Sequence, residues 1–437
     1  MLDIKFIREY QKEIKEAIKN KNINLDLDKL LQVDEQRRQL QGEIDDLRAK
    51  RNEMIKQAQG QRPNEEQIKK GKEIKEKISQ KEEKFKDVGA LYEELMSQVP
   101  AIPSPDTPIG RDDRDNIEVY RWGEPTKFDF QPKSYLELAK ELDLLDFERG
   151  VKVAGYRGYY VKNEAVFLQM GLMMYALNKL VSKGFIPIIP PTLVKEFVLF
   201  GSGYFARKKY NPEIDEIYKM ENKEKLADGA ETKENKFLIG TAEPSLLAYY
   251  ANEVLDEKDL PIKFCGFSQC YRSEIGSYGK DTKGIYRVHE FMKVEQVCLT
   301  RANIDESDKL HQELIENSKE MHQELGLPYR VLQICTGDMS AGKYKMFDLE
   351  AWMPSRNSYG ETGSASNFLD WQARRLNVKY KNKQNEKKYV YMLNNTAIPS
   401  ARFLIALLEN YQQKDGSILI PKPLQKYVGF EKIERKF

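Results

Sequence analysis

A chain of 437 residues is too long for one ordinary hydrophobic core, so we expect two domains. Its 71 Lys and Arg residues nearly balance 69 Asp and Glu residues, which excludes binding to nucleic acid through overall basic charge. Four cysteines without a Cys-x-x-Cys pair, and only three histidines, argue against a zinc site and favour reduced thiols in the cytoplasm.

No targeting or membrane segment is expected. The N-terminal residues include acids and lack the apolar stretch of a signal peptide. No uninterrupted apolar run approaches the roughly 20 residues that a membrane-spanning helix needs. We therefore predict a protein without a membrane partner.

The first predicted elements are helices. Residues 1–20 read as a short amphipathic helix, and two long polar helices follow at 28–59 and 65–99, joined by a turn at 60–64. Apolar residues on the long helices recur at steps of 3, 4 and 7, which is the narrow seam of a coiled coil. Two such helices joined by a short turn must fold back antiparallel, and each extends on the order of 50 Å at 1.5 Å per residue.

The polar surface of this helical arm leaves three interpretations open. The arm is a solvated spacer, a dimerising coiled coil, or a device whose basic side chains contact the phosphates of an RNA helix. The basic residues that the third interpretation uses are Arg37, Arg38, Arg48, Lys50, Arg51, Lys69 and Lys70.

A proline-rich linker follows the arm. Four prolines between Val99 and Gly110 forbid a helix and favour an extended path. We therefore place an N-terminal domain at 1–110, with its arm at 28–98, and a second domain at 111–437.

The second domain alternates strands with helices. Expected helices lie at 135–145, 165–183, 244–252, 304–325 and 399–413, and expected strands at 185–191, 237–243, 329–335, 346–353 and 389–393. Strands joined by hairpins and long excursions predict an α+β fold, in which helices flank a mostly antiparallel sheet.

The chain is organised around a strand, a loop and a return strand between Phe264 and Val297. The first strand ends on Arg272 and Glu274, and residues two apart on a strand share a face, so we expect these two side chains to point the same way. The return strand places four residues on one face, namely His289, Phe291, Lys293 and Glu295. This combination of an arginine, an aromatic ring and carboxylates favours a site for a planar, negatively charged ligand. The alternative is a hairpin with one polar, solvated face.

Two common phosphate-binding motifs do not account for such a site. The sequence has no Gly-x-x-x-x-Gly-Lys-Ser/Thr loop, so a P-loop is excluded. Residues 201–206 spell a dinucleotide fingerprint, but prolines precede them and residues 207–212 do not start a helix. A nucleotide bound by this chain must therefore rely on arginines, a stacked aromatic ring and a metal ion.

Four stretches of the second domain stand in an informative order: Gly184-Phe-Ile-Pro-Ile-Ile-Pro-Pro191, Thr241-Ala-Glu243, Cys270-Tyr-Arg272-Ser-Glu274 continuing to Phe291, and Leu393-Asn-Asn-Thr396 continuing to Gln412. Together with the polar arm and the proline linker, they resemble the class II aminoacyl-tRNA synthetases, and specifically the seryl-tRNA synthetase family. The resemblance covers nearly the whole chain. It implies that the arm grips the long variable arm of serine tRNA and that the first stretch, motif 1, forms a dimer interface.

The resemblance also implies an ATP site. Arg272 is expected to contact the α-phosphate, Glu274 to read the adenine amino group and Phe291 to stack on the ring, while Arg402 holds the outer phosphates. Arg272, Glu274 and Arg402 are the residues with implied catalytic roles. The implied ATP-binding set is Arg272, Ser273, Glu274, Val288, His289, Glu290, Phe291, Glu361, Thr362, Gly363, Ser364 and Arg402, with Mg²⁺ on Glu361 and Ser364.

A serine pocket is implied in the same way, formed by Thr241, Ala242, Glu243, Arg272, Glu295 and Thr396. Carboxylates suit the serine ammonium group, and a pocket that hydrogen bonds a hydroxyl rejects alanine because its own polar groups would lose their partners. One departure concerns motif 3. Residues 395–402 read Asn-Thr-Ala-Ile-Pro-Ser-Ala-Arg, where many members of the family are rich in glycine.

These features predict a cytoplasmic, homodimeric, AMP-forming ligase that activates L-serine with ATP and transfers the seryl group to the 3′ end of serine tRNA. Two alternatives stay open. One is an RNA-binding coiled-coil adaptor without catalysis, against which the retained Arg272, Glu274 and Arg402 argue. The other is a related ligase that charges a carrier protein, against which the long arm argues.

Overall fold

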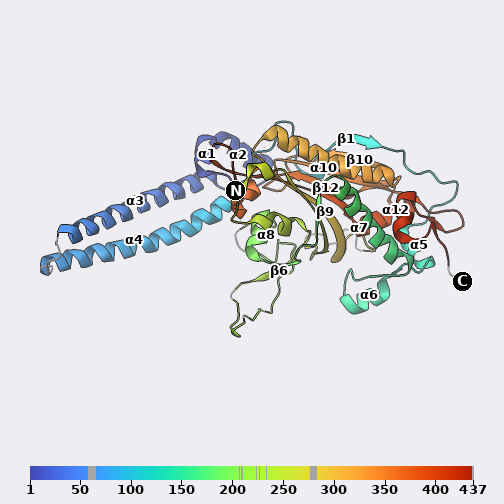
Figure 1. Cartoon of the computed structure of the whole chain (residues 1–437), viewed down its shortest axis with the longest axis horizontal. Coiled ribbons are helices and arrows are strands. Elements are labelled where there is room, and N and C mark those ends of the chain that lie inside the picture. Colours follow the sequence, from blue (N-terminus) through green and yellow to red (C-terminus); the bar gives the residue numbers. More distant parts are fainter. Residues whose placement is uncertain are drawn as a thin grey trace. The chain divides into compact units, whose positions relative to one another are not determined.

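The computed structural model describes residues 1–57, 65–205, 207, 210–222, 224–225, 227–232, 234–275 and 283–435. Contacts divide the chain into two compact units, Met1–Pro100 and Ala101–Phe437 (Figure 1). Most of the proline-rich segment belongs to the second unit. The amide of Ala101 donates to the carbonyl of Ala341, and the amide of Ser104 donates to that of Tyr344, both at 2.8 Å.

The first unit consists of four helices in its described residues: α1 (Ile4–Glu9), α2 (Gln11–Asn20), α3 (Leu27–Gln57) and α4 (Glu65–Ser97). The single helix expected at 1–20 is interrupted at Tyr10, whose φ of −110° and ψ of 44° are not helical. The turn expected at 60–64 lies outside the described residues. The two long helices α3 and α4 confirm the predicted arm.

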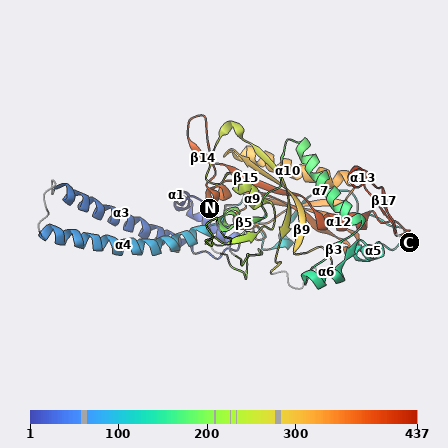
Figure 2. The ribbon, with the colours of Figure 1, turned by 60° about the horizontal axis from the view of Figure 1, so that its bottom comes forward.

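Helices α3 and α4 run side by side in both ribbon views (Figures 1 and 2). Ile44 of α3 and Ile78 of α4 are buried in the seam between them. Ion pairs border this seam, because Lys81 binds Glu43 and Arg48 lies 2.7 Å from Glu82. Exposed pairs of this kind contribute little stability, so the apolar seam holds the two helices together.

The second unit is built on an eight-stranded sheet with the order β1-β10-β11-β12-β15-β9-β8-β4. Every neighbouring pair is antiparallel except β4 and β8, which confirms the mostly antiparallel sheet. The strands, in sheet order, are Ile117–Trp122, Tyr329–Gln333, Lys345–Met353, Ser358–Asn367, Tyr391–Pro399, Glu290–Thr300, Ile262–Tyr271 and Ile186–Ile188.

Three helices supply much of the core of this unit: α7 (Glu164–Ser182), α10 (Ile304–Glu324) and α12 (Ser400–Asn410). The shorter helices are α5 (Tyr135–Glu141), α6 (Phe147–Ala154), α8 (Glu196–Ser202), α9 (Glu243–Leu247), α11 (Trp371–Leu376) and α13 (Lys422–Val428). Short strands outside the main sheet are β2 (Leu145–Asp146), β3 (Tyr160–Val161), β5 (Leu193–Lys195), β6 (Lys236–Leu238), β7 (Val254–Asp256), β13 (Lys379–Lys381), β14 (Lys387–Tyr389), β16 (Ile418–Leu419) and β17 (Lys432–Ile433).

The two faces of the central strands have different neighbours. On β9, the side-chain amide Nε2 of Gln296 donates to the carbonyl of Leu314 in α10, at 3.2 Å. Phe291 and Lys293 point to the other face, where they line a pocket. Side chains alternate along a strand, so one face of β9 packs on a helix while the other carries polar groups toward a site.

Helix α7 is the one helix in the described ranges whose length and composition would allow it to cross a membrane. Half of its most apolar stretch is nevertheless buried by the rest of the protein. Leu168, Leu172 and Ala176, for example, are fully buried in the main core of this unit. This is the packing of a core helix, which passes the same test.

Candidate active site

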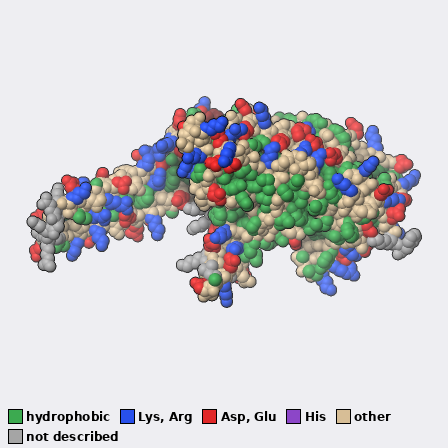
Figure 3. All heavy atoms as spheres, in the orientation of Figure 1, with side chains coloured by type: hydrophobic (Ala, Val, Ile, Leu, Met, Phe, Trp, Pro, Cys, Tyr) green, Lys and Arg blue, Asp and Glu red, His purple; other side chains and the backbone are tan. Residues whose placement is uncertain are grey.

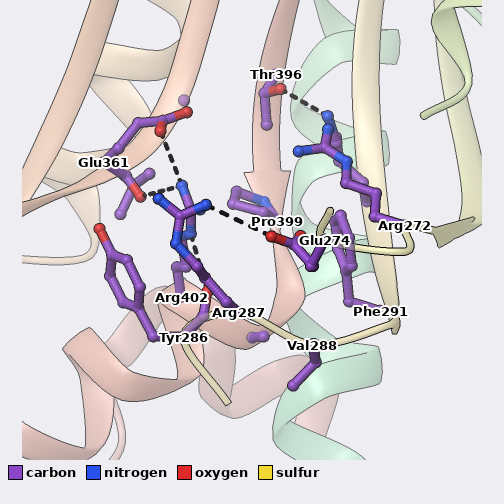
Figure 4. A pocket seen from close by; sticks show the side chains of 14 residues that line it. Arg272, Glu274, Tyr286, Arg287, Val288, Phe291, Glu361, Thr396, Pro399 and Arg402 are labelled. Atoms are coloured by element: carbon purple, nitrogen blue, oxygen red, sulfur yellow. Dashed lines mark hydrogen bonds and ion pairs between the residues drawn. The ribbon is translucent and has the colours of Figure 1, made fainter. Parts of the chain in front are cut away.

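A pocket opens on the polar face of the sheet. It lies over the ends of β8, β9 and β15, the middle of β12 and the start of α12 (Figure 4). The residues that line it are Arg272, Glu274, Tyr286, Arg287, Val288, Phe291, Lys293, Glu361, Thr362, Gly363, Thr396, Pro399, Ala401 and Arg402.

Arg402 and Glu361 form the charged pair of the pocket (Figure 4). The Nη1 atom of Arg402 lies 3.1 Å from the Glu361 carboxylate and donates to the Glu361 carbonyl at 2.9 Å. Its guanidinium also covers the ring of Tyr286, 4.6 Å from the centroid. Burial alone would raise the pKa of Glu361. The positive charges of Arg402 and, to a smaller extent, Arg272 outweigh burial and hold this pKa below its ordinary value. The pair therefore stays ionised at neutral pH.

Arg272 enters the pocket from the end of β8. Its Nε donates to the carbonyl of Gly240 at 3.2 Å, and its guanidinium carbon lies 5.5 Å from the ring centroid of Phe291. The expectation that Arg272 and Glu274 share a strand face was wrong. Strand β8 ends at Tyr271, and Glu274 has a left-handed φ of 54°. Both side chains reach the pocket because the backbone turns between them.

A buried polar chain lies beside the pocket. The ammonium group of Lys293 donates to the Thr396 hydroxyl at 3.1 Å, and that hydroxyl donates to the Glu295 carboxylate at 3.2 Å. The Thr241 hydroxyl donates to the same carboxylate oxygen at 2.9 Å. Residues from three separated stretches thus meet around one carboxylate.

Glu243 is buried near this chain, at the start of α9. Its carboxylate accepts a hydrogen bond of 2.8 Å from the side-chain amide of Gln372. Burial, followed by the negative charge of Glu295, raises the pKa of Glu243 to about 7. A carboxylate with this pKa changes its charge near neutral pH.

Eight of the residues assigned by resemblance do not line the cavity: Ser273, His289, Glu290, Ser364, Thr241, Ala242, Glu243 and Glu295. Thr241, Glu243 and Glu295 are the buried groups described above, and the surroundings of the other five are structural. The Nδ1 atom of His289 hydrogen bonds to the carbonyl of Arg272 at 2.8 Å, and the carbonyl of Glu290 accepts from the Tyr159 hydroxyl at 3.0 Å. Ala242 is buried among apolar residues, and Ser364 lies opposite Asp348 between β12 and β11.

Five lining residues were not assigned from the sequence: Tyr286, Arg287, Lys293, Pro399 and Ala401. The strand alternation could have identified Lys293, which shares a face with Phe291 and Glu295. No comparable signal was available for Tyr286 and Arg287, because they precede β9 in a segment without regular structure.

The described residues contain no group of three or more His, Cys, Asp or Glu side chains that could hold a metal ion. Two buried carboxylates do lie close enough to interact, those of Glu361, which lines the pocket, and Asp348. Burial raises the pKa of Asp348 well above its ordinary value, and the charge of Glu361 adds to this effect. One carboxylate oxygen of Asp348 is buried without a hydrogen bond partner. This donor set suits Mg²⁺, which binds one or two carboxylates and takes its other ligands from phosphates and water.

Comparison with known protein families identifies the class of protein to which this chain belongs. Residues 218–411 match the tRNA synthetase class II core domain (G, H, P, S and T), and residues 1–103 match the seryl-tRNA synthetase N-terminal domain. The pocket therefore lies in a class II aminoacyl-tRNA synthetase core.

Similar proteins narrow the class to a family. Serine--tRNA ligases from Treponema denticola and Dictyoglomus turgidum are 42% and 44% identical to this chain, covering 99% and 100% of it and 100% of each relative. The structure of seryl-tRNA synthetase from Pyrococcus horikoshii complexed with ATP matches with a TM-score of 0.88 and 37% identity over 100% of both chains. Cytoplasmic serine-tRNA ligase from Naegleria fowleri in complex with AMP matches with a TM-score of 0.84 and 32% identity, over 100% of this chain and 99% of that one. The chain belongs to the seryl-tRNA synthetase family.

Proposed function

We propose that this chain is a serine--tRNA ligase that works in two steps. The serine carboxylate attacks the α-phosphorus of ATP, which forms seryl-adenylate and releases pyrophosphate. A hydroxyl of the terminal ribose of tRNA then attacks the seryl carbonyl and releases AMP. One observation carries this proposal: the pocket that holds Arg272 and Arg402 adjoins the buried polar chain around Glu295. Lys293 and Thr396 line the pocket and also take part in that chain.

In this proposal the pocket holds ATP through charge and stacking. Arg272 binds the α-phosphate and Arg402 the outer phosphates, while Glu274 reads the adenine amino group and Phe291 stacks on the ring. The cation–π contact between Arg272 and Phe291 supports the two roles, because it keeps the guanidinium beside the ring on which adenine would stack. Adenylate formation depends mainly on positioning and charge neutralisation, so it needs no catalytic histidine.

Serine is proposed to bind the buried chain. Its ammonium group faces Glu243 and Glu295, and its hydroxyl exchanges hydrogen bonds with Thr241 and Thr396. All four side chains are buried, and Thr241 and Thr396 both donate to one carboxylate oxygen of Glu295. An amino acid without the hydroxyl makes no hydrogen bond with these groups, which is the physical basis for rejecting alanine.

Glu361 and Ser364 would hold Mg²⁺ against the phosphates, with Asp348 beside them. The ion would neutralise charge on the phosphate oxygens. Asp348 faces Ser364 in the β11–β12 ladder, and the charge of Glu361 acts on the Asp348 carboxyl, which supports a shared site for the ion. We also propose a cytoplasmic location, which the four free cysteines support.

The experiment that tests the function is ATP–pyrophosphate exchange with Mg²⁺ and each of serine, threonine, alanine and glycine, without tRNA. Exchange with serine alone would support the proposal, and charging of serine tRNA would complete it. An adaptor without catalysis would give no exchange with any amino acid. A ligase for a carrier protein would give exchange but would not charge tRNA.

The raised pKa of Glu243 predicts pH-dependent serine binding. Above its pKa of about 7 the carboxylate is ionised and attracts the serine ammonium group, whereas below it the carboxyl is neutral. The KM for serine should therefore fall about tenfold between about pH 6 and pH 8, as measured by pyrophosphate exchange. Glu243→Gln should raise this KM and remove its pH dependence, while the exposed Glu213→Gln should change neither. A flat profile in the unmodified protein would contradict the prediction.

A homodimer is proposed on the basis of an apolar surface of the second unit (Figure 3). Exposed side chains follow one face of α7 and continue to β4 and the residues after it: Phe167, Met170, Met174, Val181, Ile186 and Ile189. A patch of this kind is typical of a protein–protein interface. It includes motif 1, which supports a second copy of the chain as the partner.

Charge placed on this surface should separate the protomers. Phe167→Asp, at a side chain that is 58% exposed, buries a carboxylate in the proposed interface. Light scattering at micromolar concentration should then give the mass of one chain, whereas the unmodified protein gives twice that mass. Val153→Asp on α6 is the matched control and should stay dimeric. A single-chain mass for the unmodified protein would refute the proposal.

A further inference from the structure

Two residues of the second unit share an uncommon backbone conformation. Among the described residues, ten other than glycine have a positive φ, and seven of these are Asn or Asp, which tolerate it. Arg157 (φ 64°) and Glu274 (φ 54°) are two of the three exceptions. Such strain persists only where the surrounding structure enforces it, and it is concentrated at functional sites.

These two strained residues contact each other. The Nη1 atom of Arg157 lies 3.7 Å from the Glu274 carboxylate, and the two side chains are 3% and 7% exposed. The same Nη1 atom donates to the carbonyl of Arg287 at 3.2 Å. Arg157 thus binds both Glu274 and the backbone of a residue that lines the pocket from the other side.

The segment that carries Arg157 is fixed against the sheet. A Cβ on Gly150 of α6 would lie 2.4 Å from the backbone of Tyr159, so the helix and the following turn touch directly. The Tyr159 hydroxyl then donates to the carbonyl of Glu290 at the start of β9. Tyr159, two residues after Arg157, thus ties the turn both to α6 and to β9, which restricts where Arg157 can lie.

Glu274 has a second cationic neighbour, Arg287, at 3.5 Å. The side chain of Arg287 is 30% exposed and faces the pocket, whereas Arg157 lies behind the carboxylate. The carboxyl of Glu216 is also close. Burial raises the pKa of Glu216, and the negative charge of Glu274 raises it further. Arg157 and Arg287 thus flank the Glu274 carboxylate, with a second acid nearby.

We propose that Arg157 is a positioning residue for nucleotide selection. It fixes the Glu274 carboxylate in the orientation in which it accepts a hydrogen bond from the adenine amino group. Arg157 itself does not line the pocket, so it acts on the nucleotide only through Glu274 and Arg287. This inference rests on the proposed function, in which Glu274 reads adenine.

The test uses the full chain with Arg157→Gln and Arg157→Lys. Glutamine can keep a hydrogen bond to the Arg287 carbonyl but removes the charge, whereas lysine keeps the charge. Arg149→Ala is the matched control, because Arg149 lies on α6 with a side chain 75% exposed and pairs only with Asp146 among the ion pairs of the described residues. The readouts are the KM for ATP, the KM for serine, and the ratio of kcat/KM for ATP to that for GTP, all in serine-dependent pyrophosphate exchange.

Arg157→Gln should raise the KM for ATP by about 10-fold or more, the usual effect of losing a hydrogen-bonded charge. It should lower the ATP-to-GTP ratio while leaving the KM for serine within about twofold. Arg157→Lys should recover most of the selectivity, and Arg149→Ala should behave as the unmodified protein. An unchanged ATP-to-GTP ratio in both Arg157 variants, with only a lower melting temperature, would overturn the proposal. If the unmodified protein shows no exchange, the proposed function fails instead.

Discussion

Arg272→Ala is expected to reduce serine-dependent pyrophosphate exchange by at least about 1000-fold, close to background. The reason is the position of its guanidinium, which enters the pocket over Phe291 and is held by the Gly240 carbonyl. A fixed cation at the α-phosphate stabilises the charge that develops when the serine carboxylate attacks, and such preorganised groups contribute factors of about 100 to 1000 or more. Arg272→Lys should recover only part of the rate, because lysine cannot reproduce the planar fork.

The control for this prediction is Arg301→Ala. Arg301 directly follows the C-terminal end of β9, whereas the pocket residues of β9 lie at its start. It pairs with Glu306 on the surface, and its loss should leave exchange unchanged. Thermal unfolding of both variants separates lost chemistry from lost folding. Exchange near the normal rate in Arg272→Ala would refute the role assigned to this residue.

Shortening the helical arm is expected to separate the two half-reactions. Removing residues 43–82 and joining the cut helices by a short Gly-Ser turn keeps Leu30 and Val33, which are buried at the base of the arm. Because the second unit contains the whole pocket, pyrophosphate exchange should stay within about twofold. Charging of serine tRNA should fall by about 100-fold, through the loss of phosphate contacts.

Charge reversals on the arm distinguish phosphate contacts by its basic side chains from an effect of arm length alone. Lys50, Arg51 and Lys69 are exposed on the arm, whereas Arg48 is already paired with Glu82. Changing all three to Glu should weaken charging and reduce its dependence on salt. The same change at Lys383, Lys387 and Lys388, which are exposed on the second unit, is the control. Unchanged charging by both the shortened and the reversed arm would support the interpretation of a solvated spacer.

The long periodic elements were the most predictable part of the fold. Helices α3, α4 and α10 follow from apolar residues at helical spacing, and the ends found for α10 differ from the expected ones by a single residue. The antiparallel pair β8 and β9 followed from alternation. The break at Tyr10 could not be foreseen in this way, because the apolar pattern continues through it.

Strand β12 shows why part of the site could not be predicted. Its sequence, Ser-Tyr-Gly-Glu-Thr-Gly-Ser-Ala-Ser-Asn, has only Tyr359 and Thr362 of the β-branched and aromatic types that mark a strand, yet it carries Glu361. The small residues are needed for close packing. A Cβ on Gly363 would lie 3.0 Å from the carbonyl of Thr396. Packing partners from distant parts of the chain determine such a strand, and a local pattern does not contain them.

The site residues also divide into those that the sequence predicted and those that it did not. Resemblance to the family placed nine of the fourteen lining residues, including Arg272, Glu361 and Arg402, on the pocket. It did not identify Lys293, which joins the pocket to the Glu295 chain. The contact between Arg157 and Glu274 spans more than a hundred residues and depends on two left-handed turns, so the sequence alone gave no indication of it.

The order of the strands has a consequence for how the protein is made. The helices of the first unit lie within Met1–Pro100, so this unit can fold as soon as it leaves the ribosome. The sheet of the second unit pairs β1 with β10, which lies some two hundred residues later, and its pocket is closed only by Arg402. A growing chain therefore carries a finished arm long before it has a nucleotide site. During that interval the edge of β9 that later pairs with β15 is unpaired, and it could pair with the strands of other nascent chains.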